Sequence, residues 1–310
     1  MPSTKVIKNR ITSVKNTKKI TNAMYLIAST KMRKAKSELD SARPYFDIAE
    51  REIKRIFETK SNVDSKFFYP ESGRKPAENY AYLVVTADKG LAGAYNHNII
   101  NAAEEEMRRH KNIKLYVVGE YGRQHFHKHK IPIEKTFLYT AQNPTFRRAR
   151  EIATILLMEY RLGNVDEIRV IYSNLKSGAD SEVVVQKLLP FDRADFGGKP
   201  KAESRFNHDP DDKGEDYEFY PSATSVLDNI VPSYVAGFLY GALVDSFCSE
   251  QNARMAAMSA ANDNAEELLG ELSIEYNRVR QAAITQEITE VAAGAKAQKK
   301  KRQREAAKNE

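Results

Sequence analysis

The first sixty residues carry a helical pattern of hydrophobic positions. Apolar residues recur mostly every three or four positions, which places them on one face of a helix: Ile7, Ile11, Val14, Met24, Ala28, Met32, Ala35, Leu39 and Ala42. No glycine occurs before Gly73, and Pro44 is the one proline well inside this stretch. Because proline removes a backbone donor, we expect a bend or restart there. Residues 1–60 are therefore predicted to form one long helix, half of a coiled coil.

The middle of the chain alternates between strand and helix patterns. Short β-type runs are expected at residues 80–86, 113–118, 133–138, 167–172 and 182–189. Helical spacing is expected over residues 96–110, after Gly119, and from the Asn143-Pro144 pair to about Arg161. This alternation predicts a small, mostly parallel, Rossmann-like α/β domain over residues 78–200. The last two strands follow each other closely, so we expect an antiparallel hairpin.

The C-terminal third contains no proline from Ser233 to Glu310. Apolar or small residues there follow steps of three and four, as in a coiled-coil seam: Met258, Ala261, Ala265, Leu268, Leu272, Tyr276, Val279 and Ala283. We expect a helix over residues 222–310 with a basic tail, after an acidic linker or loop over residues 201–221. The predicted fold class is α/β, with a long antiparallel two-helix coiled coil from both termini and the α/β domain inserted between them.

Charge is distributed in blocks along the 310 residues, whose net charge is +7 and mean hydropathy −0.59. Residues 1–36 hold ten Lys or Arg and no acid, hence +10; residues 296–310 hold seven basic and two acidic, hence +5. Residues 203–218 hold seven acidic and two basic, hence −5. Such blocks indicate a nucleic acid or an acidic protein as partner.

Hydropathy and cysteine content exclude several classes of protein. The longest nearly unbroken apolar run is 235–244, whereas a membrane span needs about 20 residues, so we expect no transmembrane helix. The N-terminus lacks the apolar region of a secretory signal. Cys248 is the only cysteine, which excludes an internal disulfide and a cysteine-based zinc site and favours a reducing, cytosolic setting.

Motifs for catalysis are weak or missing. The sequence has no Walker A loop, GxSxG or HExxH motif. The turn at residues 88–93 (DKGLAG) could hold an anion at a helix start, but a tight strand-to-helix turn is the favoured interpretation. His125 and His129 share a helix face without an evident carboxylate or cysteine, so a solvated histidine cluster is favoured over a metal site. Cys248 is expected to be a packing residue.

Three blocks of sequence resemble the gamma chain of the F-type ATP synthase, and they cover nearly the whole length. The first is ITSVKNTKKITNAM at residues 11–24, followed by KMRKAK at 31–36. The second is DKGLAGAYN at residues 88–96. The third comprises Ser249-Glu250, RMAAM at 254–258, Tyr276-Asn277, RQAAITQEITE at 280–290 and Gly294-Ala295.

The resemblance implies a non-catalytic rotor shaft that couples ion flow through the membrane sector to conformational cycling of catalytic beta chains. It implies no cofactor, a ring of alpha and beta chains, an epsilon chain and a c-ring as partners, and a peripheral place on the cytoplasmic face of the cell membrane. It assigns contacts with beta chains to seven residues: Lys31, Met32, Arg33, Arg280, Gln281, Thr285 and Glu287. It assigns an apolar bearing to Ile284, Ile288 and Val291.

Three departures accompany the resemblance. Ala92 and Ala94 stand where the family usually has Cys and Gly, the acidic segment at residues 207–218 is unusual, and residues 297–310 extend past the end of many members. Two other interpretations remain: a nucleotide-using α/β enzyme with helical arms, and a basic coiled-coil module for nucleic acid. Binding of nucleotide or DNA by the isolated chain would distinguish them. The sequence does not indicate whether protons or sodium ions drive the shaft.

Overall fold

The computed structural model describes residues 4–59, 63, 65–69, 77–138, 140–175, 181–192, 196 and 218–306. The acidic segment at 207–217 lies outside the described residues, as does the predicted linker up to residue 217. The chain divides into two compact units, one of residues 1–26 with 258–310 and one of residues 27–257. The two terminal helices contribute to both units.

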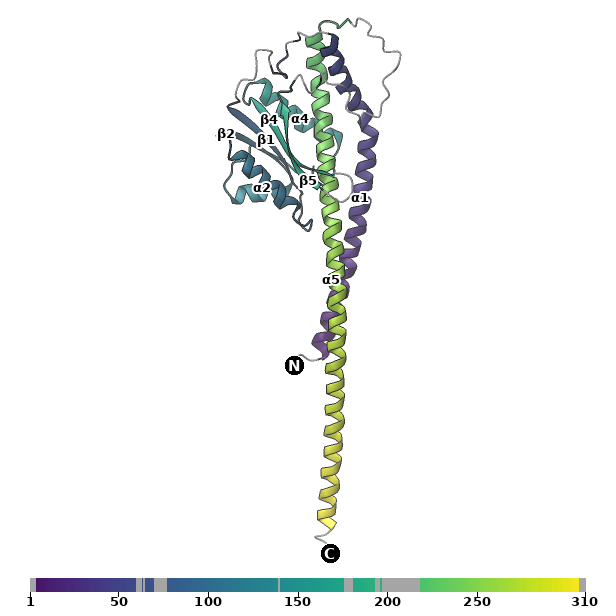
Figure 1. The fold of residues 1–310 in the computed structure, drawn as a ribbon. Helices are drawn as coiled ribbons and strands as arrows, with labels where there is room; N and C mark the ends of the chain where they lie inside the picture. The colour runs from purple at the N-terminus through teal and green to yellow at the C-terminus, as the bar shows by residue number, and fades with distance from the viewer. Residues whose placement is uncertain are drawn as a thin grey trace. The chain divides into compact units, whose positions relative to one another are not determined.

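The described residues form ten helices and strands, which follow one another along the chain (Figure 1). In order they are α1 (Thr4–Thr59), β1 (Asn79–Val85), α2 (Tyr95–Met107), β2 (Asn112–Val118), α3 (Glu120–Lys128), β3 (Lys135–Phe137), α4 (Phe146–Arg161), β4 (Glu167–Leu175), β5 (Ser181–Leu189) and α5 (Ala223–Ala306). The two long terminal helices and the α/β elements between them confirm the predicted fold class. The exact domain boundaries at residues 60, 78, 200 and 222 stay predictions.

Five strands form one sheet in the order β3-β2-β1-β4-β5. β1, β2, β3 and β4 pair in parallel, while β5 runs antiparallel to β4, as the hairpin prediction required. The chain leaves β1 toward β2 and β3, and then returns through α4 to the other side of β1. The strand order therefore reverses between β1 and β4.

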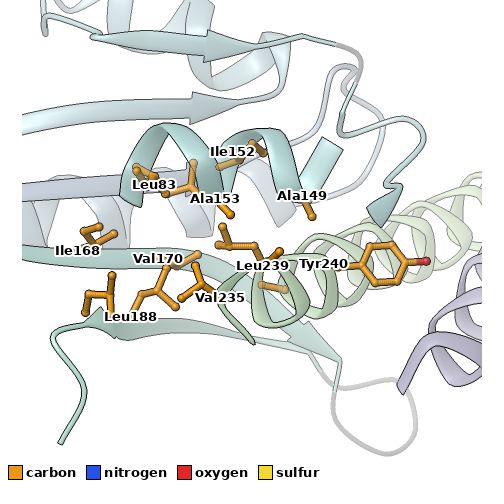
Figure 2. Close-up of a cluster of buried hydrophobic side chains, with 14 of the residues drawn as sticks. Leu83, Ala149, Ile152, Ala153, Ile168, Val170, Leu188, Val235, Leu239 and Tyr240 are labelled. Carbon is orange, nitrogen blue, oxygen red and sulfur yellow. The ribbon is translucent and has the colours of Figure 1, made fainter. Parts of the chain in front are cut away.

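Helices cover both faces of this sheet. One face packs against α2 and α3, around the buried side chains of Tyr82, Ile99, Leu115 and Phe126. The other face packs against α4 and the first part of α5. Figure 2 shows Ile152 and Ala153 of α4 near Val235 and Leu239 of α5, with Leu83, Val170 and Leu188 of the sheet in the same cluster.

Within the unit of residues 27–257, α1 packs against α5 in the same core cluster that includes the sheet. Ala35, Ile53 and Ile56 of α1 are buried in the same core cluster as Val235 and Leu239. Gly237 of α5 lies directly under the ring of Phe46, and a Cβ at this position would come within 2.2 Å of the ring atom Cδ1. The glycine therefore permits close contact between these two helices.

Two prolines lie inside the long helices, and neither ends its helix. Pro44 was expected to bend or restart α1. The helix does not restart there, because it runs as one element from Thr4 to Thr59. Pro232 leaves the carbonyl of Asp228 without its usual helical donor. Arg161 Nη2 donates to this carbonyl at 3.5 Å and so supplies a donor where the helix lacks one.

The start of α4 differs from the prediction. Asn143 was expected to cap this helix with Pro144 in its first turn. The cap is instead Thr145, whose Oγ1 accepts a hydrogen bond from the backbone nitrogen of Arg148 at 3.4 Å, and the helix begins at Phe146. The Asn-Pro signal placed the start two residues too early because threonine is itself a capping residue.

Part of α5 is apolar enough to span a membrane by length and composition, contrary to the expectation from unbroken apolar runs. The stretch Ala223–Lys299 contains an 18-residue window with mean hydropathy 1.3. However, 61% of that window is buried inside the protein. This burial is typical of a helix that forms the core of a domain.

Candidate partner-binding surfaces

The start of α1 and the second half of α5 pair as antiparallel helices in their own unit. Lys18 Nζ lies 3.1 Å from Glu266 Oε2, and Thr21 Oγ1 donates a hydrogen bond to Asn262 Oδ1. A lower residue number in α1 therefore pairs with a higher residue number in α5, as antiparallel helices require. Ile7, Met258, Ala265 and Leu272 are buried between them, and the last three belong to the seam predicted from the sequence.

Beyond this pairing, α5 continues without cover. The register of the two contacts places Thr4, where α1 begins, opposite about residue 280. Every residue from 280 to 299 is exposed. Figure 1 shows the end of α5 extending past the start of α1. The segment 280–299 is here called the free helix segment.

The free helix segment collects seven of the residues that the resemblance singles out. Ile284, Ile288 and Val291 are 43%, 64% and 74% exposed, which is high for large apolar side chains. Arg280, Gln281, Thr285 and Glu287 are exposed beside them. At 3.6 residues per turn all seven fall within an arc of about 160°. One half of the helix therefore presents an apolar stripe with polar residues among it.

The opposite half of the segment carries small residues and one hydrogen-bonded polar pair. Gln286 Nε2 donates to Glu290 Oε1 at 2.9 Å, one turn along the helix. This pair lies outside the arc of the seven residues. The asymmetry matters because a helix with one distinctive side presents a different surface to each neighbour around it.

Lys31, Met32 and Arg33 lie in the other unit, on α1, and they do not share one environment. Lys31 and Arg33 are exposed. Met32 is partly buried and packs against the hydrophobic core, and its carbonyl lies 3.9 Å from Cys248 Sγ. Arg33 lines a shallow surface hollow of about 450 Å³ together with Lys36, Ser37, Asp40 and Ser41. Lys31 and Arg33 thus face solvent, whereas Met32 also contributes to the packing of the core.

The DKGLAG turn is fixed by the protein's own groups. Asp88 Oδ1 accepts from the backbone nitrogen of Glu120 at 2.9 Å, and Asn96 Oδ1 accepts from that of Ala87 at 2.9 Å. Leu91 and Gly93 have φ values of 63° and 54°, which a tight turn requires. These contacts favour the interpretation as a strand-to-helix turn over an anion site.

The crevice between β1 and β4 is occupied by a helix. In open α/β sheets, ligands bind outside the carboxyl ends of the strands where the strand order reverses. Here Ser246, Ser249 and Glu250 of α5 lie against this edge and are only 1%, 0% and 5% exposed. The position at which such folds hold a nucleotide is therefore filled by α5.

The histidine cluster has a carboxylate beside it, which the sequence did not reveal. Glu104 Oε1 of α2 lies 2.8 Å from His125 Nε2. The rings of His125 and His129 stack with centroids 4.1 Å apart, and His129 Nδ1 contacts the carbonyl of His125 at 2.8 Å. In the described part of the chain, no group of three or more His, Cys, Asp or Glu residues could hold a metal ion.

Two titratable groups on α5 are perturbed by burial. Burial raises the pKa of the Cys248 thiol to about 11, so it stays protonated and unreactive near neutral pH. Burial also raises the pKa of Asp245 to about 6, although Arg43 and Lys36 of α1 act in the opposite direction. Asp245 was not identified from the sequence, because a single acidic residue after the apolar stretch 235–244 belongs to no recognisable motif.

Comparisons with known proteins identify the family. The ATP synthase family model matches residues 3–298. The ATP synthase gamma chain of Caldanaerobacter subterraneus subsp. tengcongensis is 43% identical over 287 residues, which cover 92% of this chain and 97% of that relative.

Solved structures share the fold. The central stalk and c-ring structure of the Tetrahymena thermophila mitochondrial ATP synthase contains a chain with a TM-score of 0.58 and 23% identity, covering 78% of this chain and 99% of that one. An ATP synthase structure of Euglena gracilis mitochondria, which includes F1 and the c-ring, contains one with a TM-score of 0.63 and 16% identity, covering 95% and 94%. With the family model and the curated relative, these observations lead to one conclusion: the chain belongs to the ATP synthase gamma chain family.

Proposed function

We propose that this chain is the central rotor shaft of an F-type ATP synthase. It owns no catalytic site, and it couples ion flow through the membrane sector to conformational cycling of the catalytic beta chains. Its partners are the ring of alpha and beta chains, the epsilon chain and the c-ring. It contacts the membrane only through these partners, at the cytoplasmic face. Membership of the gamma chain family supports this assignment.

The observation that carries the proposal is the free helix segment. An isolated helix with exposed isoleucine and valine side chains requires a partner, because such apolar surface is stabilised by burial. A cavity at the centre of a ring of subunits would supply that cover on all sides. Ile284, Ile288 and Val291 then form the bearing, where weak apolar contacts allow rotation.

The mechanism follows from the one-sided arc of this segment. Arg280, Gln281, Thr285 and Glu287 lie on one half of the segment, so at any angle of the shaft each beta chain would meet a different surface. A conformational equilibrium shifts only as far as contacts differ between its states. Rotation would therefore move each catalytic site through its states in turn. Lys31, Met32 and Arg33 on α1 would lie near acidic surfaces of beta chains, and the two positive charges support this part of the proposal.

The double variant Arg280→Ala/Gln281→Ala tests these contacts. We expect it to assemble with alpha and beta chains but to lower the ATPase rate of the complex by about threefold or more, because polar contacts that differ between states are lost. The matched control is Gln286→Ala, on the opposite half of the same segment. Equal rates for the double variant, the control and the unchanged chain would contradict the assigned contacts.

Assays on the isolated chain test the two other interpretations, a nucleotide-using enzyme and a nucleic-acid-binding module. A nucleotide-using enzyme would hydrolyse or bind ATP alone, but the crevice that would hold the nucleotide is filled by α5. A nucleic-acid module would bind DNA with log K falling by about 0.9 per phosphate contact as log salt rises. We expect neither activity, and we expect one stoichiometric complex with ATPase activity when alpha and beta chains are added.

A further inference from the structure

Buried hydroxyl groups connect α5 to the sheet at the carboxyl edge of β4. The pairing of β1 with β4 ends at Val84 and Ile171, before Ser173. The backbone nitrogen of Ser173 donates to Ser246 Oγ at 3.3 Å, and its carbonyl accepts from Ser249 Oγ at 3.2 Å. Side chains of α5 thus satisfy both backbone groups of a strand residue.

The same face of α5 is tied to α2. Tyr95 Oη lies 2.7 Å from Ser246 Oγ, and both side chains are buried. Burial raises the pKa of the Tyr95 phenol further above its already high value, so it stays neutral. Ser246 therefore takes part in two hydrogen bonds, one to the sheet and one to the helix on its far side.

A third connection lies two turns further along α5. Arg254 Nη2 donates to the carbonyl of Gly90 in the DKGLAG turn at 3.1 Å. Arg254 Nη1 also lies 2.5 Å from the buried carboxylate of Glu250, which holds the guanidinium in place. Residues 246, 250 and 254 are four apart, so they follow one face of the helix over about 12 Å.

We propose that Ser246, Glu250 and Arg254, with their partners on α2, β4 and the DKGLAG turn, form the joint that transmits torque between the α/β domain and α5. The proposal rests on the proposed rotor function and adds the residues that make the shaft turn with its domain. These residues would hold the helix in position on the domain and would take no part in the chemistry of ATP.

Physical reasons favour this joint over the apolar packing around it. Apolar contacts have no preferred direction, so a helix held by them alone can yield to twist about its axis. Hydrogen bonds are directional, and in a buried site their loss leaves polar groups unsatisfied. Bonds from one helix face to three separate segments resist both rotation and sliding. Each of the three bonded segments belongs to the α/β domain.

The test compares Tyr95→Phe/Arg254→Gln with a matched control, Tyr82→Phe. The control also removes a bonded hydroxyl from the core, at 2.6 Å from His110 Nδ1, so its hydrogen bond goes to a residue that is not on α5. A bead is attached to the α/β domain in complexes whose alpha and beta ring is fixed to a surface, with ATP withheld. The angular fluctuation of the bead then measures the torsional stiffness of the shaft.

We expect the joint variant to raise the mean-square angular fluctuation about twofold, because a cooperative polar network is worth more than its single bonds. The control should match the unchanged chain even if it melts at a lower temperature. In complete ATP synthase in vesicles, the joint variant should also transport fewer ions per ATP against an opposing gradient. The milder Ser249→Ala variant provides the same comparison if the double variant fails to fold.

Unchanged stiffness and unchanged transport per ATP in an assembled joint variant would overturn the joint. The rotor function itself would be overturned if the unchanged chain failed to rotate in the ring or failed to couple ATP hydrolysis to ion transport. The two failures are therefore distinguished by the behaviour of the unchanged chain.

Discussion

Single residues on α5 show how burial alters polar groups in this protein. Asp245 and Glu250 both have their pKa raised by burial, yet only Glu250 forms an ion pair, with Arg254. Asp245 faces α1, where Arg43 and Lys36 offset only part of the cost of burying its charge. A buried carboxylate that is weakly compensated should lower the stability of the folded chain at neutral pH.

Asp245→Asn tests this cost. The pKa of Asp245 is raised to about 6 in the folded chain from 3.8, so the folded state binds a proton more tightly than the unfolded state. Its contribution to stability is therefore full below about pH 4 and is lost as pH rises through about 6. We expect the asparagine variant to be more stable by about 1–3 kcal/mol at pH 8, with the gain vanishing near pH 4.

Urea unfolding of the full chain at both pH values measures this difference. The serine variant Ser273→Ala, which removes only a local bond to the Leu269 carbonyl on an exposed face, serves as a control without pH dependence. A gain of the same size at both pH values would contradict the role of Asp245 ionisation.

The residues of the candidate surfaces could be named from the sequence only in part. The resemblance selected the seven residues of the free helix segment, and the helical period places them on one side. It also selected Lys31, Met32 and Arg33, of which Met32 is partly buried against the core and the two basic residues are exposed. The joint was not predicted, because Tyr95, Ser173 and Ser246 are distant in sequence and have no motif in common.

Secondary-structure elements follow the sequence pattern closely where the pattern is strong. The expected strand at 113–118 is β2, at Asn112–Val118, and the expected strand at 182–189 is β5, at Ser181–Leu189. The strand expected at 133–138 shrinks to Lys135–Phe137, since it pairs only at the edge of the sheet with β2. The last helix was expected over residues 222–310, and α5 begins at Ala223 with Pro232 inside it.

Two glycines of α5 provide a test of helix packing. Gly237→Ala would bring a methyl group within 2.2 Å of the Phe46 ring, so α1 and α5 would have to separate locally. We expect a loss of about 1–3 kcal/mol in the free energy of unfolding. Gly241, one turn away, has nothing within 4 Å of a new Cβ, so Gly241→Ala should stabilise by about 0.5–1 kcal/mol.

Denaturant unfolding of the three chains under the same conditions measures both effects. Opposite signs for the two variants would show that close contact at Phe46, rather than glycine content, governs the pairing of these helices. A destabilising Gly241→Ala variant, or a neutral Gly237→Ala variant, would contradict the packing described above.

At the scale of the whole molecule, the account requires a chain that turns inside its partners. In the proposed rotor, three parts have separate tasks: the free helix segment would contact the ring, the paired helices form the shaft, and the α/β domain would turn with α5. The long helices and the α/β insertion could be predicted from periodicity alone. The rotary task came from the resemblance, because a hydrophobic stripe predicts burial without naming what buries it.

Direct observation of rotation tests this account most directly. Leu162 is 66% exposed at the end of α4, and Cys248 is buried with its pKa raised to about 11, so Leu162→Cys provides a single reactive thiol for a bead. The labelled chain is assembled with alpha and beta chains fixed to a surface, and ATP is added. The account predicts continued rotation of the bead in one direction. Steady ATP hydrolysis by the assembled complex with a bead that does not turn would contradict it.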